Sequence, residues 1–246
     1  MHVSLSLRRT WALLRHRPAG TEYKRNLQCG QYVGHVITQK LLDELWDFED
    51  PAGSEQRFAV EQASESHTDS ERAELVTQRA RALALQRQFE DGHALLDSLG
   101  DPPDAVVRTR VALETGRLLN SAGRPTEAVP EFETAARTAE TASLLFLQID
   151  ALHMLAIADK TRSSEWAAQA IDLALASPDD RTRRWLVSLH NNLGWSHFDG
   201  GRLTEALDNF RQAQDWAEHV GTEQQRVWAR EAIDECVAAM AALDNP

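Results

Sequence analysis

The chain contains an internal repeat, and no other feature of the sequence restricts its fold as strongly. Residues 190–216 place, in order, Gly194, a Gly200-Gly201 turn, Ala206, Phe210 and Ala213. Seventy-eight residues earlier, the same positions hold Gly116, Gly123, Ala128, Phe132 and Ala135. Small and aromatic residues that recur at fixed distances without a gap indicate repeated structural units.

Two further copies of this spacing are present. Because 78 is twice 39, a copy is expected midway, and that region contains Met154, Leu155 and Ala158, followed by Ala167, Ile171 and Ala174. The turn between these two groups, DKTRSS, has no glycine. A weaker copy lies 36 residues before the 109–136 unit and contains Ala80, Leu83, Gly92 and Leu96. The repeated region therefore covers residues 72–220.

The spacing has a physical explanation in helix packing. Each unit is expected to be two helices around a tight turn, in which Gly116 and Gly194 let the backbones approach while Phe132 and Phe210 fill the space beside them. One helix pair cannot bury its apolar face alone, so neighbouring pairs stack into a solenoid. Since no strand pattern is visible, the sequence predicts an all-α fold.

The pattern of small, large, glycine and aromatic positions resembles the tetratricopeptide repeat (TPR) family. The period of about 39 residues is longer than the family's usual length of about 34 and is similar to its longer-helix bacterial variants. The family's characteristic Trp and Pro positions are not matched. The resemblance implies a right-handed α-solenoid of helix-turn-helix repeats with capping helices at both ends, at residues 36–66 and 222–243.

Local signals agree with these helices. Thr68 with Glu71, and Thr222 with Gln225, have the spacing of capping boxes. Asp101 is a candidate N-cap before Pro102-Pro103, and Pro125 suits a first helical turn. The apolar residues expected to cover the first repeat are Leu42, Leu45, Trp46, Phe48, Phe58 and Val60.

Residues 1–35 differ from the rest of the chain. Residues 1–40 contain seven Lys and Arg but one acid, Glu22. We interpret 1–35 as a basic, disordered extension. A transit peptide and a basic arm that binds nucleic acid or acidic lipid remain alternatives.

Charge and composition exclude several classes of partner. The net charge is −12, and an acidic body repels nucleic acid and anionic membranes. No apolar run is long enough to span a bilayer. Two cysteines far apart fit no disulfide framework and favour a cytoplasmic location, and the preference for Arg over Lys suggests a bacterial, GC-rich genome.

The sequence predicts no enzyme, no cofactor and no metal site. His190 and His197 lie two helical turns apart, too far to share an ion without a third ligand. No zinc-protease, nucleophile-elbow, phosphate-loop or Cys-x-x-Cys motif is present.

The resemblance to TPR proteins implies a concave groove lined by the first helix of each pair. The residues predicted to line it are Arg81, Arg110, Arg117, Asn120, His153, Asn191, Asn192 and Trp195, with Arg230 of the closing helix. Arginine and asparagine suit carboxylates and peptide backbone, and Trp195 would anchor an apolar side chain. The carboxylate clamp of some family members is not reproduced, because Arg117 and Leu113 stand where its Asn and Lys would be.

We therefore expect a non-enzymatic adaptor that binds a peptide or extended segment of another protein, with acidic or carboxylate-bearing character. The alternative is a regulatory sensor that binds a signal peptide or small ligand, although no DNA-binding domain is visible. An enzyme on an α-solenoid is the third alternative. No oligomeric state is predicted.

Overall fold

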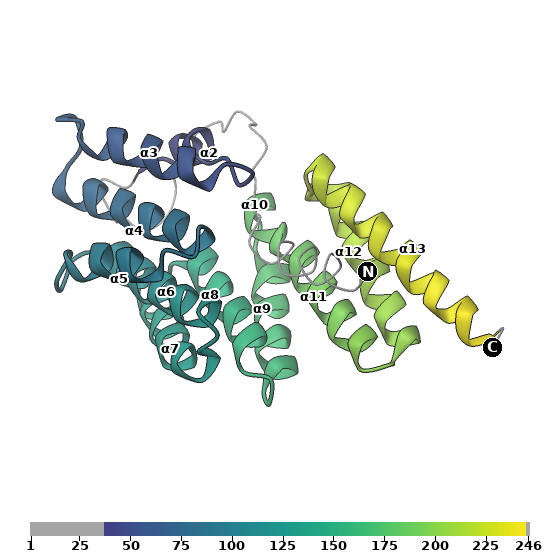
Figure 1. The fold of residues 1–246 in the computed structure, drawn as a ribbon. Helices are drawn as coiled ribbons and strands as arrows, with labels where there is room; N and C mark the ends of the chain where they lie inside the picture. Colours follow the sequence, from purple (N-terminus) through teal and green to yellow (C-terminus); the bar gives the residue numbers. More distant parts are fainter. Residues whose placement is uncertain (1–36, 245–246) are drawn as a thin grey trace. The chain divides into compact units, whose positions relative to one another are not determined.

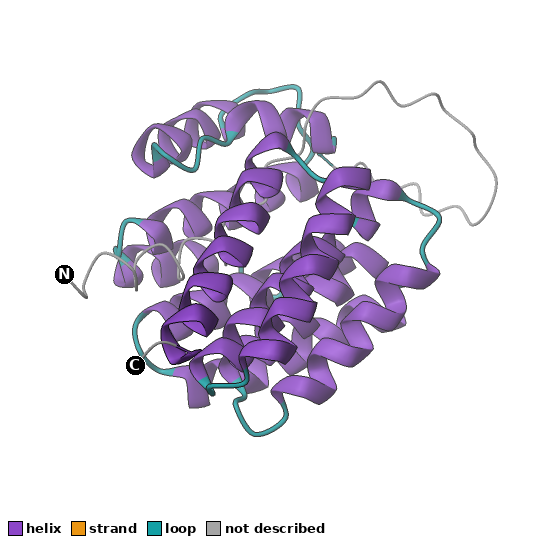
Figure 2. Ribbon diagram, turned by 90° about the vertical axis from the view of Figure 1, so that its right-hand side faces the viewer, coloured by secondary structure: helices purple, strands orange, loops and turns teal. Residues whose placement is uncertain are grey.

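The structure is a computed structural model that describes residues 37–244, and the predictions for residues 1–35 lie outside this range. Every regular element within residues 37–244 is a helix (Figure 2), which confirms the all-α prediction. The chain divides into two compact units, described separately below. We call residues 37–163 the N-terminal unit and residues 164–244 the C-terminal unit.

The helices of the N-terminal unit are α2 (Gln39–Leu45), α3 (Pro51–Gln62), α4 (Asp69–Leu85), α5 (Phe89–Asp97), α6 (Ala105–Ser121), α7 (Pro125–Thr141) and α8 (Leu145–Ala158). Those of the C-terminal unit are α9 (Ser163–Ala176), which begins at the boundary, α10 (Asp180–Arg183), α11 (Trp185–Asp199), α12 (Leu203–Val220) and α13 (Glu223–Asp244). The sequence did not predict the short helix α10.

Within each unit, helices that follow one another in sequence pack as neighbours (Figure 1). α3 packs on α4, α6 on α7, and α7 on α8, while α12 lies between α11 and α13. In the N-terminal unit the alternate helices α4, α6 and α8 also contact each other in that order. The helices α4, α6 and α8 therefore form one layer, and α5 and α7 lie outside it.

The repeated spacing between glycine and phenylalanine produces close helix packing, as predicted. A Cβ atom at Gly116 would lie 2.5 Å from Cε1 of Phe132, and one at Gly194 would lie 2.4 Å from Cε1 of Phe210. Both phenylalanine rings are fully buried. Only a residue without a side chain leaves room for the ring, so the repeated offsets serve packing.

The turn after the first helix has the same backbone in three pairs. Its central residues are Arg87, Gly123 and Gly201, with φ angles of 63°, 81° and 73°. In each turn the following N–H donates to the carbonyl five residues earlier, at distances of 2.9 to 3.0 Å: Gln88 to Leu83, Arg124 to Leu119 and Arg202 to His197. The turn after α8 differs, because Oδ1 of Asp159 accepts from the N–H groups of Thr161 and Arg162.

The capping predictions are confirmed at three helices and wrong at one. Thr68 and Glu71 form a capping box on α4, and Thr222 with Gln225 forms one on α13. Pro125 is the first residue of α7. The cap of α6 is Asp104, which accepts from the N–H groups of Val106 and Val107, so Asp101 is not the cap.

The segment before α4 packs through a small apolar cluster. Ile37, Leu42, Phe58 and Leu75 are buried together, with Trp46 against them. Val60, which we expected to cover the first repeat, is 70% exposed, because it lies on the face of α3 opposite Phe58. No helix within residues 37–244 is long and apolar enough to cross a membrane.

Candidate functional site

Polar residues recur at equivalent positions on α4, α6 and α8. Positions 74, 78 and 81 of α4 recur 36 residues later as 110, 114 and 117 of α6, and positions 150 and 153 of α8 follow at the same interval. We call this set the polar wall: Glu74, Gln78, Arg81, Arg110, Glu114, Arg117, Asp150 and His153. Because these three helices are neighbours, the residues of the polar wall lie together in one helix layer of the N-terminal unit, and most of them are buried.

Ion pairs join the helices of the polar wall. Nε of Arg110 lies 2.8 Å from Oε1 of Glu74, although this contact lacks the geometry of a hydrogen bond. Arg117 donates through Nη1 to Glu114 on its own helix and through Nη2 to Asp150 on α8. The polar wall thus carries three arginines and three carboxylates, so it has no net basic charge with His153 neutral.

The network around Arg117 is almost closed to solvent. Glu114 is 1% exposed, Arg117 4% and Asp150 5%. Burial alone would raise the pKa of Asp150, but the charges of Arg117 and Arg81 outweigh it and hold that pKa below its ordinary value. In the same way, burial would lower the pKa of Arg117, but Asp150 and Glu114 raise it. Arg117 and Asp150 are therefore charged at neutral pH.

Arg81 and His153 stand at equivalent positions at either side of Arg117. Burial, and then the charge of Arg117, lower the pKa of Arg81 to about 10. Burial lowers the pKa of His153, which is 2% exposed, to about 4. His153 is therefore neutral at physiological pH, which limits the positive charge beside Arg117.

Two atoms of this network have no hydrogen-bond partner among the described residues. They are Oε2 of Glu114 and Nε of Arg117, and both are buried. At the equivalent position of α4, Oε1 of Gln78 accepts a hydrogen bond of 2.9 Å from the indole N–H of Trp46. A buried polar atom without a partner is costly, so Glu114 presents an acceptor suited to an N–H donor.

The structure thus changes our interpretation of the residues predicted for the N-terminal part of the groove. Arg81, Arg110, Arg117 and His153 do lie on one set of neighbouring helices. Arg117 and His153 are buried, however, where we had expected open, basic side chains. Asn120, one turn beyond Arg117, is half-buried. The arginines face carboxylates of the same chain because α4, α6 and α8 pack closely.

In the C-terminal unit, Trp195 belongs partly to the core. Its ring centroid lies 4.8 Å from that of Phe210 and 5.4 Å from that of Phe198, both edge-on. It packs against the buried cluster that also includes Cys236 of α13. A change at Trp195 would therefore alter stability as well as any binding.

The other predicted residues of this unit are more accessible. Asn191 and Asn192 are half-buried on α11. The side chain of Arg230 on α13 is 53% exposed, with its Nη2 3.8 Å from Oε1 of Glu223. An exposed ion pair of this kind is screened by solvent and contributes little to stability.

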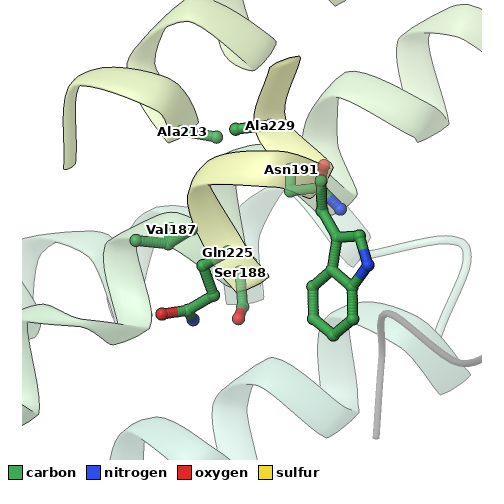
Figure 3. A pocket seen from close by; sticks show the side chains of 7 residues that line it. Val187, Ser188, Asn191, Ala213, Gln225 and Ala229 are labelled. Atoms are coloured by element: carbon green, nitrogen blue, oxygen red, sulfur yellow. The ribbon is translucent and has the colours of Figure 1, made fainter. Parts of the chain in front are cut away.

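One small pocket opens between α11, α12 and α13 (Figure 3). It is lined by Val187, Ser188, Asn191, Ala213, Gln225, Trp228 and Ala229. Its volume of about 20 Å³ is near the size needed for one water molecule. Oε1 of Gln225 is engaged by the N–H of Thr222 in the capping box. This pocket fits a small group, not a whole metabolite.

Sequence reasoning missed several members of these sites. It did not select Glu74 or Asp150, although Asp150 lies 36 residues after Glu114 and the repeat offset of the weaker copy would have found it. It also missed Gln225 and Trp228 in the pocket. These two lie on the closing helix, where the repeat pattern gives no position to compare.

The described residues include no group of three or more His, Cys, Asp and Glu side chains placed to hold a metal ion. His190 lies near Asn209, with Nδ1 3.3 Å from Oδ1, and His197 accepts from Nε of Arg202 at 3.0 Å. Burial lowers the pKa of His190. Cys236 is buried, and its thiol lies 3.4 Å from the carbonyl of Leu203.

No protein-family model matches the chain, and a search of curated proteins finds no relative.

Proposed function

We propose that this protein is a non-enzymatic interaction module of the TPR kind, in which helix pairs stack into a right-handed α-solenoid and bind an extended segment of another protein. The repeated glycine–phenylalanine packing and the three equivalent turns support the repeat architecture. The count of two cysteines supports a cytoplasmic location.

The observation that carries the proposal is the polar wall. A helix layer between neighbours is normally filled by apolar side chains, and buried charges add little stability compared with apolar groups of the same size. Here α4, α6 and α8 place charged or polar residues at equivalent repeat positions instead. Such a row of polar groups at regular intervals suits an extended chain, which presents backbone groups at regular intervals.

The pocket of the C-terminal unit leaves little room for a whole small ligand. Small-molecule pockets commonly measure about 300–1,000 Å³. The pocket between α11, α12 and α13 is far smaller. The sensor alternative therefore gains no support from this pocket.

The polar wall does not require an acidic partner. Arg110 and Arg117 already face Glu74, Glu114 and Asp150. A partner carboxylate would have to compete with these three groups, whereas a donor of N–H groups would complement Glu114. We therefore propose a segment recognised by polar backbone contacts, with Asn120, one turn beyond Arg117 on α6, as a half-buried contributor.

The test is selection of random displayed peptides on the full-length protein, followed by fluorescence anisotropy with the selected sequences. We expect Asn120→Ala to weaken binding by about tenfold or more, as for central interface residues. The side chain of Asn120 is half-buried. Its truncation should leave the melting temperature almost unchanged.

The matched control is Asp208→Ala on α12, a second helix of its pair, where the carboxylate is 70% exposed. Its affinity should equal that of the wild type. Failure to select any peptide, or equal affinities for Asn120→Ala and Asp208→Ala, would contradict the proposal. Trp195→Ala is unsuitable for this purpose because the ring packs on Phe210.

A further inference from the structure

Residues 37–48 lie against the α4 end of the polar wall. The backbone N–H of Ile37 donates to Oε2 of Glu74 at 3.2 Å. The indole N–H of Trp46 donates to Oε1 of Gln78 at 2.9 Å. The guanidinium carbon of Arg81 lies 5.8 Å from the ring centroids of both Trp46 and Phe48. The segment thus engages all three positions that α4 contributes to the polar wall.

These contacts have the chemistry of peptide recognition. They combine a backbone N–H with a carboxylate, an aromatic N–H with an amide oxygen, and aromatic rings with an arginine. The rings of Trp46 and Phe48 are stacked, with centroids 4.6 Å apart. A segment that only shielded apolar surface would need the apolar cluster of Leu42 and Phe58. It would not need any of these polar contacts.

The equivalent positions on α6 differ in one respect. Glu114 is the counterpart of Gln78 one repeat later, and its Oε2 is buried without a hydrogen-bond partner. At α4 the acceptor therefore has its N–H donor from residues 37–48, while at α6 one acceptor has none. The position on α4 thus resembles an occupied binding subsite, and the position on α6 resembles an empty one.

Residues 37–48 contain little secondary structure that would be stable without the rest of the protein. α2 has seven residues, too few to be a stable helix by itself. Its order depends on the contacts of Ile37, Leu42 and Trp46 with α3 and α4. A segment of this kind can be exchanged for another that makes the same contacts.

We propose that residues 37–48 are an internal ligand of the polar wall and that the partner segment replaces them with the same chemistry. The partner would bring an aromatic residue with an N–H donor, such as tryptophan, to Gln78 and Arg81, and a further N–H donor to Glu114. This inference rests on the proposed function and names the class of segment that it binds.

The first experiment uses a fluorescein-labelled synthetic peptide of residues 37–50 and the full-length protein. The Trp46→Ala variant vacates the contact with Gln78, so it should bind the peptide about tenfold or more tightly than the wild type does. A peptide with Ala in place of Trp46 should not bind. Val60→Ala, an exposed change on α3, is the matched control and should behave as the wild type.

Two results would overturn the inference. One is equal affinity of the peptide for the wild type and Trp46→Ala. The other is a Trp46→Ala variant that keeps its helical circular dichroism and cooperative melting but does not bind the peptide. In both cases residues 37–48 would be a structural cap alone.

A second variant covers the case in which Trp46→Ala does not fold. Gln78→Leu removes the acceptor of the indole N–H but keeps the volume of the side chain. Hydrogen exchange of residues 37–48 should then be faster by about tenfold or more, while α6 and α7 are unchanged. Unchanged exchange in the segment, or faster exchange throughout the N-terminal unit, would count against the inference.

These outcomes can be separated from failure of the proposed function. Peptides selected on the wild type that bind without competition from the 37–50 peptide would support the function and overturn this inference. Selected peptides that are displaced by the 37–50 peptide, and that contain an aromatic residue, would support both.

Discussion

At the scale of single residues, two glycines determine how closely the paired helices approach. A Cβ atom at Gly194 would meet the ring of Phe210 at 2.4 Å. Overpacking typically costs about 1–3 kcal/mol, while alanine gains about 1 kcal/mol in helix propensity over glycine. We therefore expect Gly194→Ala to lower the free energy of unfolding by about 1–2 kcal/mol, measured by urea denaturation.

Two comparisons identify the ring as the cause. Gly200→Ala is the control, because there a Cβ atom would meet only the flexible side chain of Arg202. It should be nearly neutral. Phe210→Leu in combination with Gly194→Ala should show a favourable coupling energy, since the smaller side chain leaves room for the methyl group. Simple additivity of the two changes would argue against the packing explanation.

At the turn residue Arg87 we predict the opposite effect, namely that a substitution stabilises the protein. It has a φ of 63°, where the equivalent positions hold Gly123 and Gly201. A left-handed conformation costs a non-glycine residue about 1–2 kcal/mol, so Arg87→Gly should stabilise the protein by up to about 1 kcal/mol after the entropy of glycine is included. Gly123→Ala should destabilise it. Thermal melting of the two variants checks the direction of both changes in stability. A lower melting temperature for Arg87→Gly than for the wild type would show that the backbone at Arg87 is not strained.

At the scale of helices, the ion network joins α6 to α8 through Arg117 and Asp150. Removal of Arg117 alone leaves two carboxylates buried, so Arg117→Met should destabilise the protein by about 3–5 kcal/mol. The triple variant Glu114→Leu, Arg117→Met, Asp150→Leu removes every charge of the network. It should be as stable as the wild type or more so. Urea denaturation compares the two variants, and a triple variant weaker than the single one would contradict this account.

The layer of α4, α6 and α8 also contains His153, which should make the stability of the protein sensitive to acid. Burial lowers the pKa of His153 to about 4 in the folded protein, from an ordinary value of 6.5, although the charge of Asp150 opposes this shift. The unfolded chain therefore binds more protons between these two values, and stability falls as the pH decreases from about 6.5 to 4. At pH 4.5 this cost is about 2–3 kcal/mol relative to pH 7.5.

The measurement is urea denaturation of the wild type and His153→Gln at both pH values. The variant cannot take up this proton, so its loss of stability on acidification should be smaller by about 2 kcal/mol. His190, whose pKa is also lowered by burial, and the carboxylates titrate in both proteins. They therefore cancel in the comparison. Equal acid sensitivity of the two proteins would show that His153 is accessible to protons in the folded state.

At the scale of the whole molecule, the sequence predicted those features that depend on local spacing. The glycine–phenylalanine offsets predicted which side chains meet, because both lie within one helix pair. Capping boxes at Thr68 and Thr222 depend on three-residue spacing and were predicted for the same reason. The all-helical fold followed from these units together.

The features that depend on distant segments were not predicted. Arg117 was expected in an open groove, but its exposure depends on Asp150 on another helix. Trp46 was expected to cover the first repeat as an apolar residue, but its hydrogen bond to Gln78, 32 residues later, was not predicted. Sequence spacing identifies the face of a helix, whereas burial is decided by the element that packs against it.

The central claim is that the polar wall exists to bind a segment of another protein and not to stabilise the fold. The most direct measurement is the affinity of a selected peptide for the triple variant Glu114→Leu, Arg117→Met, Asp150→Leu, together with its melting temperature. We predict an unchanged or higher melting temperature and an affinity weaker by about tenfold or more. Unchanged affinity in a fully folded triple variant would show that the polar wall does not bind the peptide.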